Sequence, residues 1–406
     1  MFRILLFFAA ALPATAGWVT TWSTGVAQPY TDPTQLNTAH LIFNNQTLRQ
    51  VVHISLGSDM VRVRISNVFG AAPLEIGAAH IATRTTGSSI DAKTDHKLTF
   101  SGRASVIVPP NAVVISDPLT FDALPMTDQV ISLFFPNTAS GAAIHYGALQ
   151  TNYIGAGDQT SAASIRSATS VSFYAFLAGL DVTSTDPNAG TIVTLGDSIT
   201  DGSRSTSNTN HRWPNLLAAR LLTSNIENLG VANVGISGNR VLHDAPGLTS
   251  GVNALARFGH DVLEQPNVKY ILILEGINDL GQPGTTSAPI SEAVTADDVI
   301  AGLQQLADRA HELGIKVIGC TLTPFAVATN VGYYSPERDA DRQAINAWIR
   351  SGAAFDAVVD FEMAVRDPDH PDQFLAAYDS GDHLHPNNDG YQAMADAIDL
   401  TIFQQQ

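Results

Sequence analysis

The spacing of hydrophobic residues changes near residue 190, and this change predicts two domains of different classes. Before it, apolar and polar side chains alternate in short runs. Such a period of two is typical of strands that bury one face. Clusters of Gly, Pro, Asn and Asp separate the runs, which fall at residues 49–56, 61–66, 104–108, 129–135 and 171–177. Residues 17–181 are therefore predicted to form an all-β domain, a sandwich or jelly-roll-like fold of antiparallel strands.

A polar, turn-rich stretch at residues 182–190 is predicted to be a linker to a second domain at residues 191–406. In this second part, strand candidates alternate with helical stretches; the strands are expected at residues 192–195, 228–231, 270–274, 316–321 and 358–361. One helix is expected to bury a single apolar face and to stop at Gly314; the face comprises Val299, Ile300, Leu303, Leu306, Ala307, Ala310 and Leu313. Apolar strands that alternate with helices predict a parallel sheet flanked by helices, an α/β fold.

Composition excludes some partners. The chain has 406 residues, long enough for two domains, with 45% hydrophobic and 15% charged residues, as in globular proteins. Its net charge is 21 − 38 = −17, which argues against nucleic acid or an anionic membrane surface as a partner. Cys320 is the only cysteine, so no intramolecular disulfide can form. It lies in an apolar run, and we expect it in the core.

The N-terminus has the pattern of a secretory signal peptide. Arg3 precedes an apolar stretch at residues 4–12, and the stretch ends in Ala14-Thr15-Ala16. This pattern predicts cleavage after Ala16 and an extracellular protein. A short membrane anchor is the alternative, but the stretch falls short of the ~20 residues that a spanning helix needs, and no later segment is long and apolar enough for integral membrane association. Asn45 begins the one glycosylation sequon, which only a eukaryotic host would use.

Four short segments follow the first, second, third and last of the predicted parallel strands. They are Gly-Asp-Ser-Ile at residues 196–199, a glycine-containing stretch at 233–239, Gly-Ile-Asn-Asp at 276–279 and Asp-His-Leu-His-Pro at 382–386. The carboxyl ends of parallel strands meet at one edge of a sheet, where α/β proteins bind their ligands. We therefore expect these segments to converge on one crevice.

Chemistry assigns a role to each segment. Ser198 is the candidate nucleophile, and His385 the base that accepts its proton and returns it to the leaving alcohol. Asp382, three residues before His385, would fix the imidazole tautomer and stabilise the imidazolium. Backbone amides of Ser198 and Gly238 and the side-chain amide of Asn278 are candidates for the oxyanion hole. This reaction requires no cofactor.

The segments, their order and their spacing resemble the GDSL-type esterase/lipase family, part of the SGNH hydrolase superfamily, over residues 191–400. The resemblance implies Ser198, Gly238, Asn278 and His385 as the four hallmark residues, with Asp382 completing the triad. It also implies a flavodoxin-like three-layer α/β/α fold, in agreement with the alternation of strands and helices. Residue 199 is isoleucine where the family name has leucine, a conservative exchange, and no G-x-S-x-G elbow surrounds the serine.

Other readings exist for the neighbouring residues. His383 suggests a metal pair with Asp382 and Asp379, but alternation in a loop does not impose metal geometry, and the family needs no metal. Residues 243–244 either line the substrate pocket or lie in a solvated loop. Asp279 is expected to shape the loop around the preceding asparagine rather than to react.

The combined prediction is a secreted serine esterase that acts on small-molecule or polysaccharide esters through an acyl-enzyme. Short acyl groups, above all acetyl esters of carbohydrates, are favoured because no long apolar stretch or lid-like amphipathic insertion flanks the motifs. One alternative is a lipase or phospholipase that acts on longer chains. Another is a carbohydrate-binding protein in which the β-domain dominates, with Trp18 and Trp22 as stacking residues. In a third, the β-domain only packs against the enzyme and shapes its rim. The sequence leaves the oligomeric state open.

Overall fold

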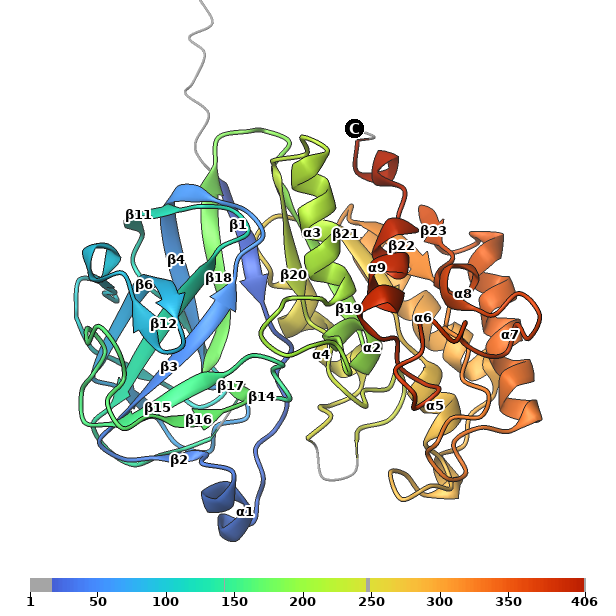
Figure 1. Cartoon of the computed structure of the whole chain (residues 1–406), viewed down its shortest axis with the longest axis horizontal. Coiled ribbons are helices and arrows are strands. Elements are labelled where there is room, and N and C mark those ends of the chain that lie inside the picture. Colours follow the sequence, from blue (N-terminus) through green and yellow to red (C-terminus); the bar gives the residue numbers. More distant parts are fainter. Residues whose placement is uncertain (1–16, 142, 246–248, 405–406) are drawn as a thin grey trace, which may run out of the picture.

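The computed structural model describes residues 17–141, 143–245 and 249–404, which form two domains side by side (Figure 1). The predicted signal peptide, residues 1–16, lies outside the described residues. Among the described residues, no helix combines the length and the apolar character needed to cross a membrane.

The N-terminal domain contains two main antiparallel sheets, which confirms the predicted β-sandwich. The first has the order β1 (Gly17–Ser23), β18 (Leu177–Ser184), β4 (Ser58–Ser66) and β10 (Val113–Ile115), and β11 (Leu119–Ala123) also pairs with β4. The second has the order β16 (Thr169–Val171), β15 (Asn152–Ala156), β3 (Gln46–His53), β12 (Asp128–Phe135), β6 (Ala78–Thr86) and β7 (Ser89–Ile90), with β8 (His96–Lys97) on β6. Fully buried side chains from both sheets, such as Val63 and Ile131, form one core.

Short elements complete this domain. Three two-stranded ladders pair β2 (Ile42–Phe43) with β13 (Ala139–Ser140), β14 (Ile144–Tyr146) with β17 (Phe173–Ala175), and β5 (Leu74–Ile76) with β9 (Val106–Val108). Helix α1 (Pro33–Thr38) and the 3-10 turn η1 (Ala92–Thr94) are the helical elements before residue 190 in the described chain. The single run expected at residues 171–177 therefore contributes to three separate strands.

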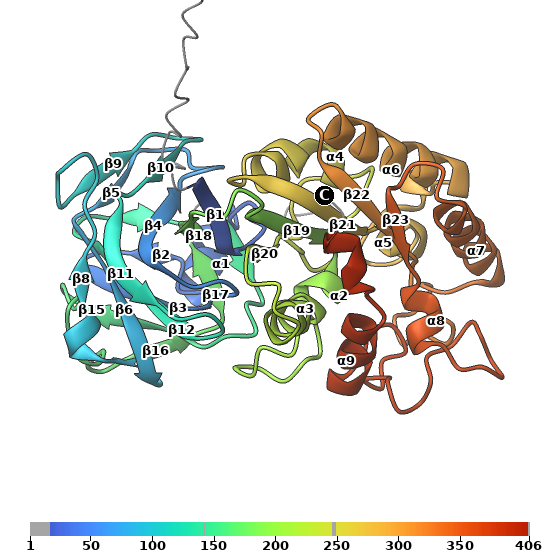
Figure 2. The ribbon, with the colours of Figure 1, turned by 90° about the horizontal axis from the view of Figure 1, so that it is seen from above.

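The second domain has one parallel sheet in the order β20 (Leu229–Asn233), β19 (Gly190–Gly196), β21 (Val268–Leu274), β22 (Lys316–Cys320) and β23 (Ala357–Val359). In chain order this is 2-1-3-4-5, the flavodoxin-like arrangement, whose switch point lies between its first and third strands. One face carries α3 (Trp213–Thr223), α8 (Phe361–Val365) and α9 (Asn388–Asp396); the other carries α4 (Ala254–Arg257), α6 (Ala296–His311) and α7 (Pro336–Ser351) (Figure 2). The predicted three-layer α/β/α fold is confirmed.

Shorter elements lie between these. They are α2 (Ser198–Asp201), the π-helical turn η2 (Phe258–Leu263), α5 (Ile277–Gly281), and the 3-10 turns η3 (Ile290–Glu292) and η4 (Leu400–Phe403). Cys320, at the end of β22, is 1% exposed, as its apolar surroundings predicted.

Three sequence-based boundaries differ from the structure. The strand expected at 358–361 ends at Val359, because Asp360 caps α8 by accepting a hydrogen bond from the Met363 amide at 3.0 Å. Leu313 does not share the buried face of α6, because that helix ends at His311 and the leucine beyond it is 62% exposed. Strands β18 and β19 occupy both ends of the linker predicted at 182–190, and residues 185–189 connect them.

The two domains meet along the edge of the parallel sheet. Strand β1 packs against β20 so closely that a Cβ atom on Gly230 would lie 2.1 Å from the carbonyl oxygen of Thr20, so only glycine fits there. The Thr20 amide donates to Oγ1 of Thr191 at 3.0 Å, and the Val231 amide donates to Oγ of Ser55 at 2.9 Å. The β-domain thus covers a sheet edge whose backbone groups would otherwise be unpaired.

Candidate active site

Ser198 lies where β19 turns into α2. Its neighbour Asp197 caps this short helix by accepting a hydrogen bond from the Ile199 amide at 2.9 Å. The turn is tight: a Cβ on Gly196 would lie 2.2 Å from Oγ1 of Thr200. These contacts place the serine at the carboxyl end of the first parallel strand, 8% exposed and at the wall of a cleft.

The structure brings the three predicted triad residues together. Oγ of Ser198 lies 2.8 Å from Nε2 of His385, and Nδ1 of His385 lies 2.8 Å from Oδ2 of Asp382. A carboxylate oxygen accepts only, so Nδ1 carries the imidazole proton and Nε2 presents its lone pair to the serine hydroxyl. This is the geometry that a serine nucleophile and its base require.

Asp382 is held in its ionised form. Burial raises the pKa of this carboxyl, but hydrogen bonds from the ring and the backbone amide of His385, and from the Leu384 amide, outweigh burial and leave the pKa well below its usual range. Nε of Arg204 also donates to Oδ2 at 2.9 Å from an exposed position. Sequence reasoning missed this arginine, because it belongs to none of the four segments.

Gly238 and Asn278 line the same cleft as Ser198. Gly238 has φ +80°, and Nε2 of Gln282 donates to its carbonyl oxygen at 2.9 Å, which holds the peptide between Gly238 and Asn239. Nδ2 of Asn278 donates to the carbonyl oxygen of Asn239 at 3.0 Å. The side-chain nitrogen of an asparagine carries two hydrogens, so the second N–H of Asn278 is left for a ligand in the cleft.

The carbonyl oxygen of Asn239 only accepts and so makes Nδ2 the donor end of the Asn278 amide, an orientation that is reinforced by Tyr333. Its hydroxyl donates to Oδ1 of Asn278 at 2.8 Å, and burial raises the pKa of the phenol well above its ordinary value, so it remains a donor. Sequence reasoning missed Tyr333 and Gln282. Neither stands in a motif, and Tyr333 is 55 residues away from the asparagine that it contacts.

A fully buried arginine ties the ends of the strands together beneath the site. Arg257 donates to the carbonyl oxygens of Gly196 at 3.0 Å and Val234 at 2.6 Å, and to Oδ1 of Asn239 at 2.8 Å. It also lies 3.6 Å from a carboxylate oxygen of Glu275, just after β21. One guanidinium therefore joins the segments that carry Ser198, Gly238 and Asn278. No motif or spacing in the sequence pointed to this arginine.

Three carboxyl groups near the site are buried, and burial is the largest influence on the pKa of each. It raises the pKa of Asp197 to about 7, against the hydrogen bond from the Ile199 amide, and the pKa of Glu275 well above its usual value. It raises the pKa of Asp279 to about 6, although Asp279 accepts hydrogen bonds from the amides of Val241 and Leu242 at 2.8 and 3.0 Å. These amides belong to the chain just beyond Gly238, so Asp279 holds that loop, whereas the shaping role expected for it concerned the loop around Asn278.

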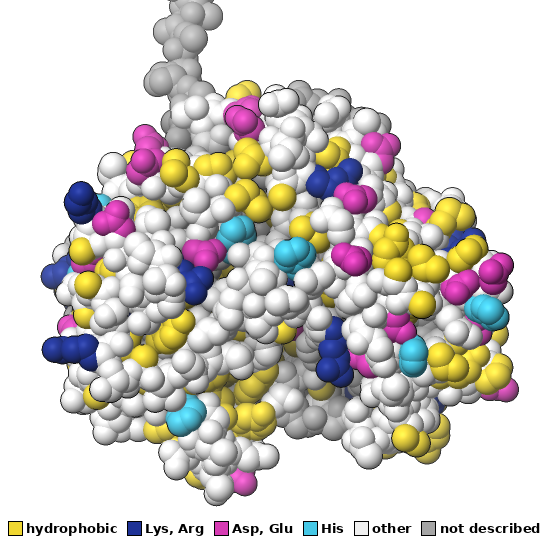
Figure 3. Space-filling model, viewed as in Figure 1, with side chains coloured by type: hydrophobic (Ala, Val, Ile, Leu, Met, Phe, Trp, Pro, Cys, Tyr) yellow, Lys and Arg dark blue, Asp and Glu magenta, His cyan; other side chains and the backbone are white. Residues whose placement is uncertain are grey.

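The cleft has a volume of about 520 Å³, and its described lining comes entirely from the α/β domain. Most of the lining side chains carry hydroxyl or amide groups: Ser198, Ser203, Ser237, Thr249, Ser250, Asn278, Gln282, Thr286, Ser287 and Asn330. Neither His243 nor Asp244 belongs to this lining. On the face drawn in Figure 3, acidic side chains are scattered among basic and uncharged ones rather than gathered in one patch.

The remaining candidates lie apart from this chain of hydrogen bonds. Nδ1 of His383 contacts a carboxylate oxygen of Asp379, and the His383 side chain is 42% exposed. Within the part of the chain that the structure describes, no group of three or more His, Cys, Asp or Glu side chains is placed to hold a metal ion. Trp22 lines a small cavity between the domains, whereas the Trp18 ring lies 4.3 Å from the guanidinium carbon of Arg62. Asn45, the glycosylation candidate, is exposed.

The second domain is similar in sequence to a known family. The sequence model of the GDSL-like lipase/acylhydrolase family matches residues 194–393. No curated protein matches the chain at a significant level. Similar solved structures include a GDSL-like lipase from Bacteroides thetaiotaomicron VPI-5482, 21% identical over 53% of this chain and 88% of that one, with a TM-score of 0.38. An α/β hydrolase from the Lake Arreo metagenome is 24% identical over 53% of this chain and 94% of that one, with a TM-score of 0.39. An acetyl xylan esterase from Geobacillus stearothermophilus is 22% identical over 53% and 96%, also with a TM-score of 0.39.

Proposed function

We propose that the chain is a carboxylic ester hydrolase of the GDSL-like lipase/acylhydrolase family, whose sequence model matches residues 194–393, and that Ser198, His385 and Asp382 carry out its reaction. The observation that supports this assignment is the continuous chain of hydrogen bonds from the serine through the histidine to the aspartate, 2.8 Å at each step. It lies beside the switch point of the sheet, where α/β folds bind their ligands.

In the proposed reaction, His385 takes the proton of Ser198 as Oγ attacks the ester carbonyl carbon. The C=O bond opens to a tetrahedral oxyanion, and the imidazolium is stabilised by ionised Asp382. When the intermediate collapses, the ester C–O bond breaks and the alcohol leaves with the proton from His385. A water molecule then attacks the acyl-enzyme, gives its proton to His385 and releases the carboxylic acid as Ser198 regains its hydrogen.

The oxyanion is assigned to three donors: the backbone amides of Ser198 and Gly238 and Nδ2 of Asn278. Gln282 and Tyr333 support this assignment, because Gln282 holds the chain on the carboxyl side of Gly238 and Tyr333 holds the Asn278 amide before substrate arrives. Donors that are already oriented need no rearrangement when charge develops, and the loss of one typically lowers turnover by ~10²–10³.

The preferred substrates are proposed to be short-acyl esters of carbohydrates, acetyl esters above all, handled outside the cell after removal of residues 1–16. The polar lining of the cleft supports this choice, because hydroxyl and amide side chains can pair with sugar hydroxyls. A long acyl chain needs a mostly apolar channel to displace water. In the described lining, Ala245, Tyr333 and Leu384 are the mainly apolar side chains.

The test uses the chain without residues 1–16. Turnover of p-nitrophenyl acetate should vanish in Ser198→Ala and persist in Ser287→Ala, an exposed serine of the same cleft. A fluorophosphonate probe should label Ser198. Label on Ser237, or full activity of Ser198→Ala, would overturn the assignment.

Substrate preference is measured on p-nitrophenyl esters from acetyl to palmitoyl, with acetylated xylan alongside. We expect kcat/KM to fall as the acyl chain lengthens and acetate to be released from the xylan. A maximum at long chains would identify a lipase instead. The binding role of the β-domain would be favoured if residues 17–181 were retained on polysaccharide and the chain without residues 1–16 showed no ester turnover.

A further inference from the structure

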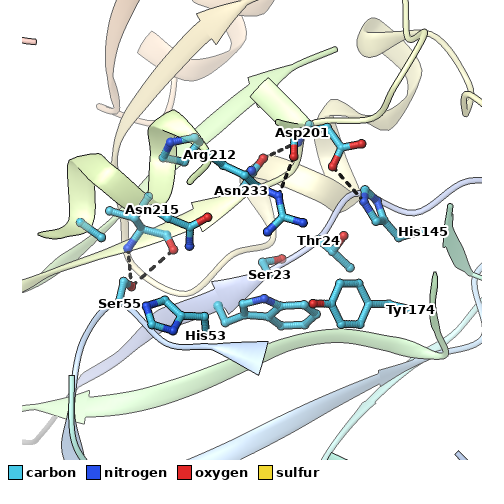
Figure 4. A pocket seen from close by; sticks show the side chains of 15 residues that line it. Ser23, Thr24, His53, Ser55, His145, Tyr174, Asp201, Arg212, Asn215 and Asn233 are labelled. Carbon is cyan, nitrogen blue, oxygen red and sulfur yellow. Dashed lines mark hydrogen bonds and ion pairs between the residues drawn. The ribbon is translucent and has the colours of Figure 1, made fainter. Parts of the chain in front are cut away.

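One side chain of the β-domain reaches the helix that carries the nucleophile. His145, in the middle of β14, lies with its Nε2 3.0 Å from Oδ1 of Asp201, the last residue of α2, as Figure 4 shows. Its other ring nitrogen, Nδ1, lies 2.9 Å from the carbonyl oxygen of Gly25. The two side chains are 5% and 4% exposed, so the contact is shielded from water.

Asp201 passes this contact on to the loop that carries Gly238. While Oδ1 faces His145, Oδ2 accepts a hydrogen bond from Oγ of Ser237 at 2.7 Å. Oγ of Ser203 lies 3.0 Å from that same hydroxyl, and both serines line the cleft. A single carboxylate therefore links the nucleophile helix, the residue before Gly238 and the β-domain.

The hydrogen-bond partners fix the ring of His145. The carbonyl oxygen of Gly25 and the carboxylate of Asp201 are both acceptors, so each ring nitrogen of His145 faces an acceptor. If the ring were flipped, its carbon atoms would face these acceptors and both hydrogen bonds would be lost. The carboxylate makes the bond to Asp201 charge-assisted and hence stronger than a neutral one. The other charged group at this point is Arg212, which donates from Nε to the backbone oxygen of Asp201 at 2.6 Å.

The same part of the β-domain also presses directly on the loop. A Cβ on Gly25 would lie 2.7 Å from both the carbonyl oxygen of Val234 and Cγ1 of Ile236. The segment around Gly25 is joined to β14 by paired hydrogen bonds between Ala27 and Ile144, at 2.7 and 3.0 Å. His145 and Gly25 thus form one unit, in which Gly25 packs directly on Val234 and Ile236 and His145 reaches Ser237 through Asp201.

We propose that His145 is a positioning residue of the esterase, through which the β-domain holds the Gly238 loop in place to stabilise the oxyanion. This inference rests on the proposed function, since it assigns Gly238 to the oxyanion hole. In this proposal the β-domain affects the reaction rate although none of its described residues lines the cleft. A misplacement of about 1 Å in a catalytic group can lower turnover by ~10²-fold, so a remote contact of this kind can affect the rate.

The chain offers a matched control in His53. Both histidines come from the β-domain and line the small cavity between the domains. His53, however, binds Asp128 of its own domain through Nδ1 at 2.7 Å. His53→Ala removes a partly buried imidazole from the same cavity without touching the link to Asp201.

Three substitutions separate the two hydrogen bonds of His145. Glutamine can place an N–H near the position of Nε2 and keep the bond to Asp201. Asparagine reaches only the position of Nδ1, and alanine makes neither bond. On p-nitrophenyl acetate we expect His145→Ala and His145→Asn to lower kcat roughly tenfold or more, with KM changed less than about threefold. We expect His145→Gln to keep most of the wild-type kcat and His53→Ala to be unchanged.

Equal kcat in all three His145 variants and wild type would overturn the proposal, as would equal losses in His145→Ala and His53→Ala. If His145→Ala fails to fold, the comparison of the asparagine and glutamine variants still decides. A double variant with Ser237→Ala should lose less than the product of the single losses, because both act through Asp201; a full product would contradict the shared path. An inactive Ser198→Ala alongside fully active His145 variants would refute this inference and leave the proposed function intact.

Discussion

The hydroxyl of Tyr333 donates to Oδ1 of Asn278 at 2.8 Å, and this contact turns the N–H groups of that amide toward Asn239 and the cleft. An amide can be turned end for end at little cost unless a partner distinguishes its oxygen from its nitrogen. The carbonyl oxygen of Asn239, which only accepts, is such a partner, and the hydroxyl of Tyr333 reinforces the same orientation. The tyrosine is 3% exposed, so no water replaces it without rearrangement.

Tyr333→Phe should therefore weaken the oxyanion site while preserving the shape of the pocket. We expect kcat to fall roughly tenfold, less than the ~10²–10³ of a lost oxyanion donor, because Nδ2 remains in place. Buried Oδ1 would lose its donor, which typically costs about 1–3 kcal/mol of unfolding free energy. Steady-state kinetics and urea unfolding measure the two effects. An unchanged kcat would show that the Asn239 contact alone orients the amide.

Asn278→Ala should remove the side-chain donor itself. We expect kcat to fall by ~10²–10³ with little change in KM, since the donor acts on charge that develops only in the transition state. Initial rates over a range of p-nitrophenyl acetate concentrations give both constants. A variant that mainly raises KM would place Asn278 in ground-state binding.

The two neighbouring histidines should behave differently. His385→Ala should abolish turnover, because it removes the base that contacts Ser198, whereas His383→Ala should leave substantial activity, because its ring contacts Asp379. Prolonged dialysis against EDTA should change neither rate nor fold, since serine acyl transfer needs no metal. Inactivation by EDTA with recovery on added zinc, or an indispensable His383, would require Asp382, His383 and His385 to be reconsidered as ligands.

Stability should depend on pH through the buried carboxyls. The pKa of Asp197 is raised to about 7 and that of Asp279 to about 6, from about 3.9 in an unfolded chain. Between these values the folded state binds more protons than the unfolded state, so unfolding free energy falls as pH rises from about 4 to about 7. Their contribution is complete below pH ~4 and is lost as pH passes through the folded values.

Asp197→Asn tests this sign, because its amide oxygen can still accept the hydrogen bond from Ile199. Urea midpoints at several pH values should decline less between pH 4 and 7 in Asp197→Asn than in wild type. Asp369→Asn, at an exposed loop position, should follow the wild-type curve. Parallel curves for wild type and Asp197→Asn would mean that Asp197 is ionised in the folded state throughout this range.

The sequence by itself determined the features that rest on local, repeated patterns. Alternation of apolar residues separated a β-sandwich from an α/β domain, and five apolar runs gave the parallel strands to within a few residues. The rule that parallel strands end at one edge then predicted that Ser198, Gly238, Asn278 and His385 would converge. Local pattern failed at element ends, as at Leu313 and residues 358–361, because a cap or the last turn depends on single side chains rather than on a period.

The tertiary structure decided which residues hold that set in place. No spacing rule in the sequence predicts the contacts made by Tyr333, Arg257 and the pair His145–Asp201, because the partners lie far apart in the chain. His145 and Asp201, for example, are 56 residues apart and belong to different domains. Their hydrogen bonds exist because packing of the domains buries donors beside acceptors, and a buried polar group must find a partner wherever the chain brings one. The sequence pattern therefore predicted the proposed reacting groups, and only the fold fixed their orientation.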